Sequence, residues 1–112
     1  MKYFPTQGDI IWLDFDPQTG NEQRGRRPAV VVTNKIFNNF AKTGAMVCPI
    51  TNTDKNIPIR IKLDDRTKTK GNILTDHAKI LDLAQRNAEF IEVLPKDILH
   101  EVVDVLHGFI EV

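Results

Sequence analysis

The chain of 112 residues has few of the features that would assign it to a class at once. It contains one cysteine, Cys48, which excludes an intramolecular disulfide framework and a cysteine-rich zinc site. No apolar run approaches the roughly 20 residues that a membrane-spanning helix needs. The first residues lack the long apolar segment that is typical of a secretion signal. We therefore expect a cytoplasmic protein that has no contact with a membrane.

The composition is that of a soluble globular protein. Hydrophobic residues make up 41% of the chain and charged residues 27%, and the length fits one domain over residues 1–112. The net charge is zero, but residues 20–70 carry eleven Lys and Arg against four acids, and residues 71–112 carry three against eight. This division allows a basic face that suits a polyanion, while scattered, solvated charges explain the same count.

The apolar pattern predicts a mainly β protein with short helices. A helical turn is expected at 35–39, and three- and four-residue apolar spacing from Ile98 to Ile110 predicts an amphipathic helix that begins near Pro95. In the strand run that contains it, Pro49 is expected to cause a bulge or an end. We predict a barrel-like sheet closed by this helix. The expected strands are 10–15, 28–33, 45–51, 57–63, 72–75, 79–83 and 88–93.

The sequence gives little support for a metal or cofactor. His77, His100 and His107 do not have the spacing of a zinc site, and surface positions are the more common explanation for such histidines. No Walker or dinucleotide-binding motif is present. Cys48 lies in an apolar run beside Pro49, which favours a buried, unreactive thiol. We therefore expect no metal and no cofactor.

The most unusual segment is residues 22–28. Arg24, Arg26 and Arg27 follow Glu22 closely, on a loop that leads into the expected strand 28–33. The planar guanidinium group suits phosphate, and functional residues often collect on loops that a rigid scaffold holds. A solubilising loop with an internal ion pair accounts for the same residues, since exposed ion pairs are common.

Two segments of the N-terminal part carry a resemblance to a known family. GDIIWLDFDP at 8–17 and GNEQRGRRPAVV at 20–31 closely resemble the MazF/PemK toxin family, and Pro49-Ile50-Thr51 matches a later segment of that family. The likeness extends over nearly the whole chain. It implies an SH3-like, partly open β-barrel of the CcdB/MazF type with a C-terminal helix, in a homodimer. It also implies a metal-independent, sequence-specific endoribonuclease that cleaves single-stranded mRNA.

The resemblance also implies a partner. The toxin is expected to be held inactive by a cognate antitoxin, whose disordered acidic C-terminal segment lies over the RNA site, and the complex is expected to bind DNA. Residue by residue, Arg27 and Thr51 stand at the family's catalytic arginine and threonine, and Glu22 at a glutamate that some members need. Gln23, Gly25 and Pro28 match residues that shape the loop.

The implied chemistry uses the RNA's own 2′-OH as nucleophile, which must lie in line with the leaving 5′-oxygen. Arg27 is expected to bind the nonbridging oxygens and Thr51 to add a hydrogen bond. Glu22 is expected to orient Arg27 or to accept a proton. The sequence does not give the cleavage motif, which depends on loops such as 64–70. Further RNA contacts are expected from Gln23, Arg24, Arg26, Lys55, Arg60, Lys62, His77 and Lys79.

Two other functions remain open at this point. Related CcdB-like toxins of the same fold inhibit DNA gyrase by binding and cleave nothing. An inactive family member would only bind RNA or an antitoxin. RNA cleavage by the purified protein in EDTA separates the nuclease from both alternatives.

Overall fold

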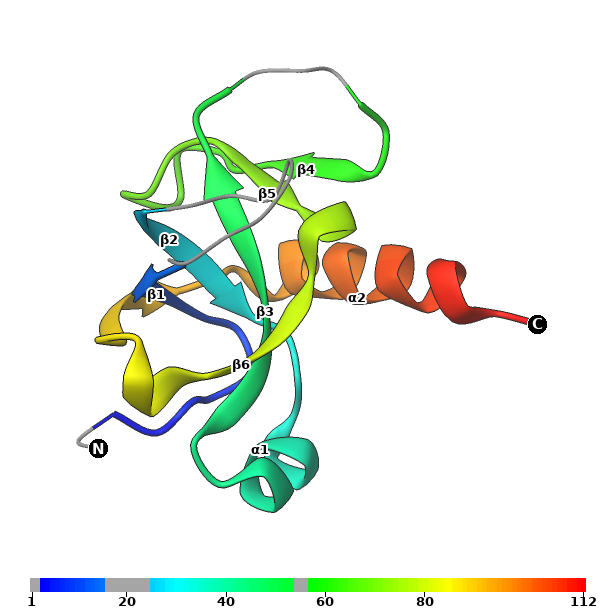
Figure 1. Cartoon of the computed structure of the whole chain (residues 1–112). Helices are drawn as coiled ribbons and strands as arrows, with labels where there is room; N and C mark the ends of the chain where they lie inside the picture. The colour runs from blue at the N-terminus through cyan, green and yellow to red at the C-terminus, as the bar shows by residue number, and fades with distance from the viewer. Residues whose placement is uncertain (1–2, 16–24, 54–56) are drawn as a thin grey trace.

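The computed structural model describes residues 3–15, 25–53 and 57–112. Its strands form an antiparallel, open sheet in the order β4-β5-β3-β2-β1-β7, and β6 also pairs with β3 (Figure 1). This arrangement confirms the mainly β class. The strands are β1 (Asp9–Asp14), β2 (Arg26–Val31), β3 (Gly44–Thr51), β4 (Arg60–Lys62), β5 (Asn72–Leu74), β6 (Lys79–Asp82) and β7 (Glu89–Val93).

The helices include the expected C-terminal one. α1 (Lys35–Ala41) begins after Asn34, whose side-chain oxygen accepts a hydrogen bond from the backbone N–H of Phe37. α2 (Lys96–Ile110) follows Pro95, as the apolar spacing predicts. Two short 3₁₀ turns, η1 (Thr75–His77) and η2 (Leu83–Gln85), complete the order. Neither α1 nor α2 is long and apolar enough to cross a membrane, and no other helix in the described ranges is.

Side-chain alternation along the strands divides the core into two faces. We call the first the α2 face, because Ile10, Val30 and Ile50 on this side pack with Ile98 and Val102 of α2. We call the second the opposite face. Its buried cluster consists of Ile11, Leu13, Phe15, Ala29, Val31, Ala45, Val47 and Leu83. These two faces decide which side chains share a site.

Two expected strands differ from the structure. β3 neither ends nor breaks its register at Pro49, which pairs with Ala29 in an unshifted ladder. Along the other edge of β3, β6 pairs as far as Val47 and β5 pairs from Ile50. Pro49 therefore lies between these two partners, where its missing N–H removes no paired donor on that side.

The expected strand 57–63 is shorter in the structure. Only Arg60–Lys62 is a strand, because the N–H of Arg60 donates to the carbonyl of Ile57 and closes a turn over the first residues. The alternation still holds in the remaining part. Ile61 and Leu63 are buried and Lys62 is exposed.

Candidate functional site

The pairing of β2 with β3 brings Arg27 and Thr51 to the same end of the sheet. Ala29 pairs with Pro49, Val30 with Cys48 and Val31 with Val47. Arg27 and Thr51 each stand two residues beyond the Ala29–Pro49 pair, at the same end of these two strands. Both side chains belong to the opposite face, since Ala29, Val31, Ala45 and Val47 of the same strands pack there. The pairing thus brings two residues that are 24 positions apart in the sequence to one end of the sheet.

The backbone of Thr51 is in close contact with Gly71. A Cβ placed on Gly71 would overlap the carbonyl oxygen of Thr51, and φ of Gly71 is +122°. Glycine is therefore required at this position on both steric and conformational grounds. The Thr51 side chain is buried, and its Oγ1 accepts a hydrogen bond from the N–H of Thr53 at 3.3 Å. The loop 64–71 is thus packed directly against one member of the expected catalytic pair.

Arg26 faces away from Arg27 and is already paired. Its Nη1 lies 3.0 Å from Oδ1 of Asp14 and its Nη2 lies 3.1 Å from Oε1 of Glu89. Hydrogen bonds from Asn87 and from Arg26 hold the pKa of Asp14 below its usual value. Arg26 lies on the α2 face with two carboxylates beside it, so it is less suited to bind phosphate than its position in the sequence suggests.

The other expected RNA contacts lie in different surroundings. Arg60 holds Asp76 through Nε at 3.2 Å and Nη2 at 3.1 Å, whereas Lys62 is exposed on β4. Burial, and then the nearby Arg86, lower the pKa of Lys79, which pairs with Val47 in the ladder and so shares the opposite face with Arg27 and Thr51. Gln23, Arg24, Lys55 and the expected catalytic Glu22 lie outside the described residues, so their roles stay predictions.

The cysteine and the three histidines lie in different surroundings. Cys48 is completely buried, which confirms the expected burial, and burial raises the pKa of its thiol to about 12, which disfavours the reactive thiolate. His100 and His107 are exposed on α2. His77 is largely buried: its Nδ1 finds no hydrogen-bond partner among the described residues, and its Nε2 lies 3.7 Å from Asp76. In the described part of the chain, no group of His, Cys, Asp and Glu is arranged to hold a metal ion.

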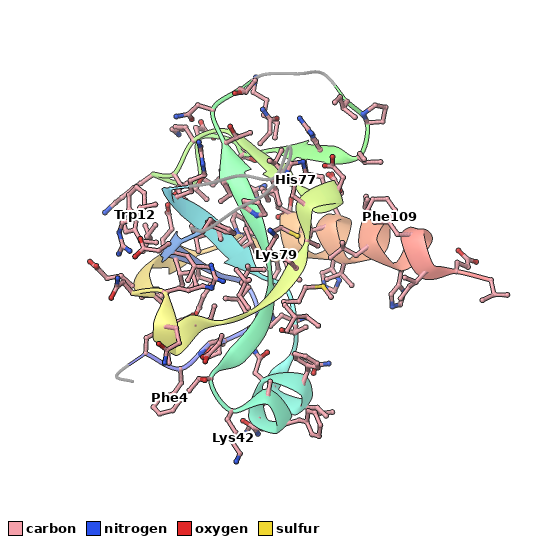
Figure 2. The ribbon with its side chains drawn as sticks, in the orientation of Figure 1. Phe4, Trp12, Lys42, His77, Lys79 and Phe109 are labelled. Atoms are coloured by element: carbon pink, nitrogen blue, oxygen red, sulfur yellow. The ribbon has the colours of Figure 1, made fainter. Side chains whose placement is uncertain are left out.

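A pocket of about 460 Å³ opens at the same end of the sheet, mainly on the α2 face. Figure 2 shows Trp12 at this end of the molecule, well separated from His77. The sequence did not predict this pocket. Trp12 stands within an apolar strand run, which indicates a core position, and the lysines of the loop 64–71 are typical of a solvated charged segment. The lining residues are Trp12, Arg26, Arg27, Pro28, Ile50, Asn52, Lys68, Thr69, Lys70 and Ile91.

One wall of the pocket is a loop that Glu92 of β7 holds in place. The carboxylate of Glu92 accepts hydrogen bonds from the N–H of Lys68 at 3.0 Å, and from the N–H and the hydroxyl of Thr69, both at 2.8 Å. Partial burial alone would raise the pKa of Glu92, but these bonds outweigh it and hold the pKa below its usual value. The pocket wall is therefore fixed by a carboxylate that lies behind it.

Further contacts secure the same loop. The ammonium group of Lys70 donates to the carbonyl of Thr67, and the buried Thr67 hydroxyl donates to the carbonyl of Thr69. Arg66 bridges Asp64 of the loop and Asp97 in the first turn of α2, at 2.8 and 2.9 Å. The loop 64–71 contains no apolar residue, as the sequence shows, yet it is well ordered by polar contacts.

The fold and these residues define a small antiparallel β protein with a basic site at one end of its strands. The chain matches the family described as PemK-like, MazF-like toxin of type II toxin–antitoxin system over residues 6–110, and it belongs to that family. The resemblance in the N-terminal segments is thereby confirmed.

Relatives of known function support the same assignment. Endoribonuclease toxin MazF of Escherichia coli (strain K12) is 41% identical over 88 residues, covering 78% of this chain and 77% of that protein. The crystal structure of MazF from Deinococcus radiodurans matches with a TM-score of 0.88 at 36% identity, covering 96% of both chains. A MazE-MazF crystal structure from the same organism matches with a TM-score of 0.83 at 34% identity and the same coverage.

Proposed function

We propose that this chain is the endoribonuclease toxin of a type II toxin–antitoxin system, and that it cleaves single-stranded mRNA at a short sequence motif. The observation that supports the proposal is the pairing of β2 with β3, which leaves Arg27 and Thr51 at the same end of the sheet and on one face, in a chain of this family. A cation and a hydroxyl on one face of a rigid sheet end form a compact binding site for a phosphate group. Because mRNA is translated in the cytoplasm, we also propose a cytoplasmic location for the protein.

The reaction needs no metal, because RNA supplies its own nucleophile. The 2′-oxygen attacks the adjacent phosphorus, the bond to the 5′-oxygen breaks, and a 2′,3′-cyclic phosphate and a 5′-hydroxyl result. Negative charge develops on the nonbridging oxygens. Arg27 donates to these oxygens through its planar guanidinium, and Thr51 adds a hydroxyl donor. The two side chains stabilise the transition state more strongly than the substrate.

Proton transfer is assigned to a different residue. A guanidinium group is a poor proton acceptor near neutral pH, so we do not assign the general base to an arginine. Glu22, with a reference pKa of about 4.3, is the better acceptor for the 2′-OH proton, or else it orients Arg27. If Glu22→Gln left both the rate and its pH profile unchanged, neither role would stand.

The remaining contacts to RNA are proposed to be electrostatic. Lys62 is exposed on β4 and Lys79 lies on the face of Arg27, so both suit the phosphate backbone. Arg26 and Arg60 hold carboxylates and have to exchange partners before they bind RNA. The loop residues Gln23, Arg24 and Lys55 and the partly buried His77 complete the proposed path.

The proposed partners are a second copy of the chain and an antitoxin. Phe109 and Ile110 are exposed near the end of α2, which extends beyond the sheet (Figure 1), and they suit a homodimer contact. MazE–MazF structures of relatives support an antitoxin as partner. We propose that the antitoxin's acidic C-terminal segment lies over the basic residues around Arg27.

The test is cleavage of a long single-stranded RNA in EDTA by wild type, Arg27→Ala and Thr51→Ala. Discrete cuts with 5′-hydroxyl ends, lost in both variants, are expected, and mapping the ends gives the motif. Arg26→Ala is the matched control on the neighbouring position. No cuts by the folded wild type across several RNAs would favour a gyrase-type inhibitor or an inactive binder. Cuts that persist in Arg27→Ala would keep the family and overturn this site.

A further inference from the structure

Apart from Arg27, the residues that line the pocket on the α2 face have no role in the chemistry assigned to Arg27 and Thr51. We propose that it binds one unpaired nucleotide next to the scissile phosphate, with the base against Trp12 and the phosphate near Lys68 and Lys70. The identity of the ligand as RNA rests on the proposed function. The existence of a nucleotide subsite rests on the pocket itself and is tested separately below.

The floor of the pocket suits a base. Trp12 is 40% exposed although it stands in a core strand, while its neighbours Ile11 and Leu13 are completely buried. Pro28, Ile50 and Ile91 supply the remaining apolar surface. Single-stranded nucleic acids bind proteins largely by stacking unpaired bases on aromatic side chains. A volume of about 460 Å³ lies within the usual range of small-ligand pockets, roughly 300–1,000 Å³.

The rim of the pocket suits a phosphate. Lys68 and Lys70 stand on one wall and Asn52 and Thr69 add polar groups, while no carboxylate is among the described lining residues. Two carboxylates do lie nearby, Asp14 and Glu89, and both hold Arg26. Arg26 is therefore engaged with these carboxylates, and we assign the phosphate to the two lysines.

Hydrogen bonds within the chain hold the wall of the pocket. The three hydrogen bonds to Glu92 fix the backbone between Lys68 and Thr69, and Lys70 is held to the carbonyl of Thr67. A pre-formed wall reduces the entropy lost on binding.

The pocket is continuous with the proposed catalytic pair. Arg27 belongs to the opposite face and also borders the pocket. Ile50 and Asn52, the residues before and after Thr51, line the pocket as well. A strand of RNA that passes around this end of the sheet thus meets the pocket one step from the scissile phosphate. A base held there contributes to the choice of cleavage motif.

The chain offers a direct reporter for this test. Trp12 is its single tryptophan, so intrinsic tryptophan fluorescence reports this pocket alone. The full-length wild type is titrated with non-cleavable 2′-O-methyl octamers of A, of C and of U, and with a decaglutamate peptide. We expect a saturable change with at least one octamer, weaker at 0.5 M than at 0.05 M NaCl. No change with any octamer, or a change with the peptide alone, would overturn the nucleotide subsite.

Variants separate stacking from mere packing. With a dye-labelled octamer followed by anisotropy, Trp12→Ala is expected to lower the affinity about tenfold or more, and Trp12→Phe by less than about threefold. Phe40→Ala, which removes an exposed aromatic residue from α1, is the control and should change nothing. Thermal unfolding of each variant checks its fold. Equal affinities for wild type and a folded Trp12→Ala would contradict the proposal.

The two proposals fail in different ways. If wild type cleaves RNA but Trp12 does not respond to octamers, including one with the mapped motif, the subsite is wrong and the nuclease stands. If Trp12 responds but no RNA is cut, the subsite stands and the nuclease is wrong. In an active enzyme, Trp12→Ala is further expected to relax the motif at one position beside the cut.

Discussion

The two faces of one strand end are built in different ways. On the opposite face, backbone pairing between β2 and β3 brings Arg27 and Thr51 to the same end of the sheet. On the α2 face, side-chain contacts from Glu92, Arg66 and Thr67 hold the lysine wall of the pocket. The first arrangement follows from strand register. The second follows from a few polar groups on a loop.

This difference suggests a division of roles, in which the sheet carries the catalytic groups and the loop contributes to the choice of RNA sequence. A sheet register is cooperative and does not change with one side chain, which suits groups that must keep a fixed geometry. A loop held by individual hydrogen bonds can change with single substitutions while the sheet stays intact. We therefore expect relatives with different cleavage motifs to differ more in the loop 64–71 than at Arg27 and Thr51.

The largest effect is expected from removing Arg27. Arg27→Ala deletes the charged donor that faces the developing negative charge, and loss of one such donor lowers kcat by about 10²–10³-fold. Single-turnover cleavage of the mapped RNA measures this change, and circular dichroism checks the fold. The rate constant, rather than KM, should carry the effect.

Arg26→Ala is the matched control for that prediction. Its guanidinium is shared by Asp14 and Glu89, so its loss should lower the rate by less than about tenfold. If the two variants lost activity equally, the division between the two faces would be wrong.

The next effect is expected where the loop meets the sheet. Gly71→Ala puts a Cβ onto the Thr51 carbonyl at a φ that alanine rarely adopts, and it should lower the free energy of unfolding by about 2–3 kcal/mol. Activity should fall as well, because Thr51 must move. Urea unfolding and the cleavage assay measure both effects.

Gly108→Ala is expected to change the free energy of unfolding in the opposite direction. Gly108 lies within α2 with nothing close to its Cβ position, so alanine should stabilise the protein by about 0.5–1 kcal/mol. Equal destabilisation by both substitutions would mean that the contact with Thr51 has no special role.

The sequence predicted the strands and helices better than the way in which neighbouring strands pair. Apolar alternation and helical spacing located the strands and α2, because burial decides these patterns locally. The continuation of β3 through Pro49 was not predictable, since it depends on where β6 ends and β5 begins along the other edge of β3. Such a gap between partners exists only in the assembled sheet.

The candidate site was predictable only in part. The expected pair came from a family resemblance, and the pairing of β2 with β3 explains why Arg27 and Thr51 stand at the same end of the sheet. Arg26 looked equivalent to Arg27 in the sequence, but alternation sends it to the other face and into two ion pairs. Glu92 gave no signal, because its three partners are backbone and hydroxyl groups more than 20 residues away.

A smaller effect is expected from Glu92→Gln, which tests the pocket wall. The amide keeps one oxygen for the three donors and loses the charge, so KM should rise about three- to tenfold with kcat unchanged. Glu101→Gln, on the exposed side of α2, is the control. A fall in kcat alone would show that the wall acts on chemistry and not on binding.

The same variant has a defined pH dependence. The pKa of Glu92 is lower in the folded protein than in the unfolded chain. Its contribution to stability is therefore complete above the unfolded pKa of about 4.3 and is lost as the pH falls through the folded pKa. The difference in Tm between wild type and Glu92→Gln should be constant above about pH 5 and should shrink as the pH falls through the lowered folded pKa of Glu92. A difference in Tm that did not change with pH would point to packing instead of charge.

The smallest effect is expected at the other anchor of the loop. Asp97→Asn removes one carboxylate from Arg66, but Asp64 keeps the guanidinium in place at 2.8 Å. All three groups are exposed, and exposed ion pairs contribute little and are screened by salt. We expect Tm to fall by less than about 3 °C in 0.05 M NaCl, with no difference in 0.5 M NaCl, and octamer binding to change by less than twofold. A larger loss of binding than in Glu92→Gln would assign the wall of the pocket to α2 rather than to β7.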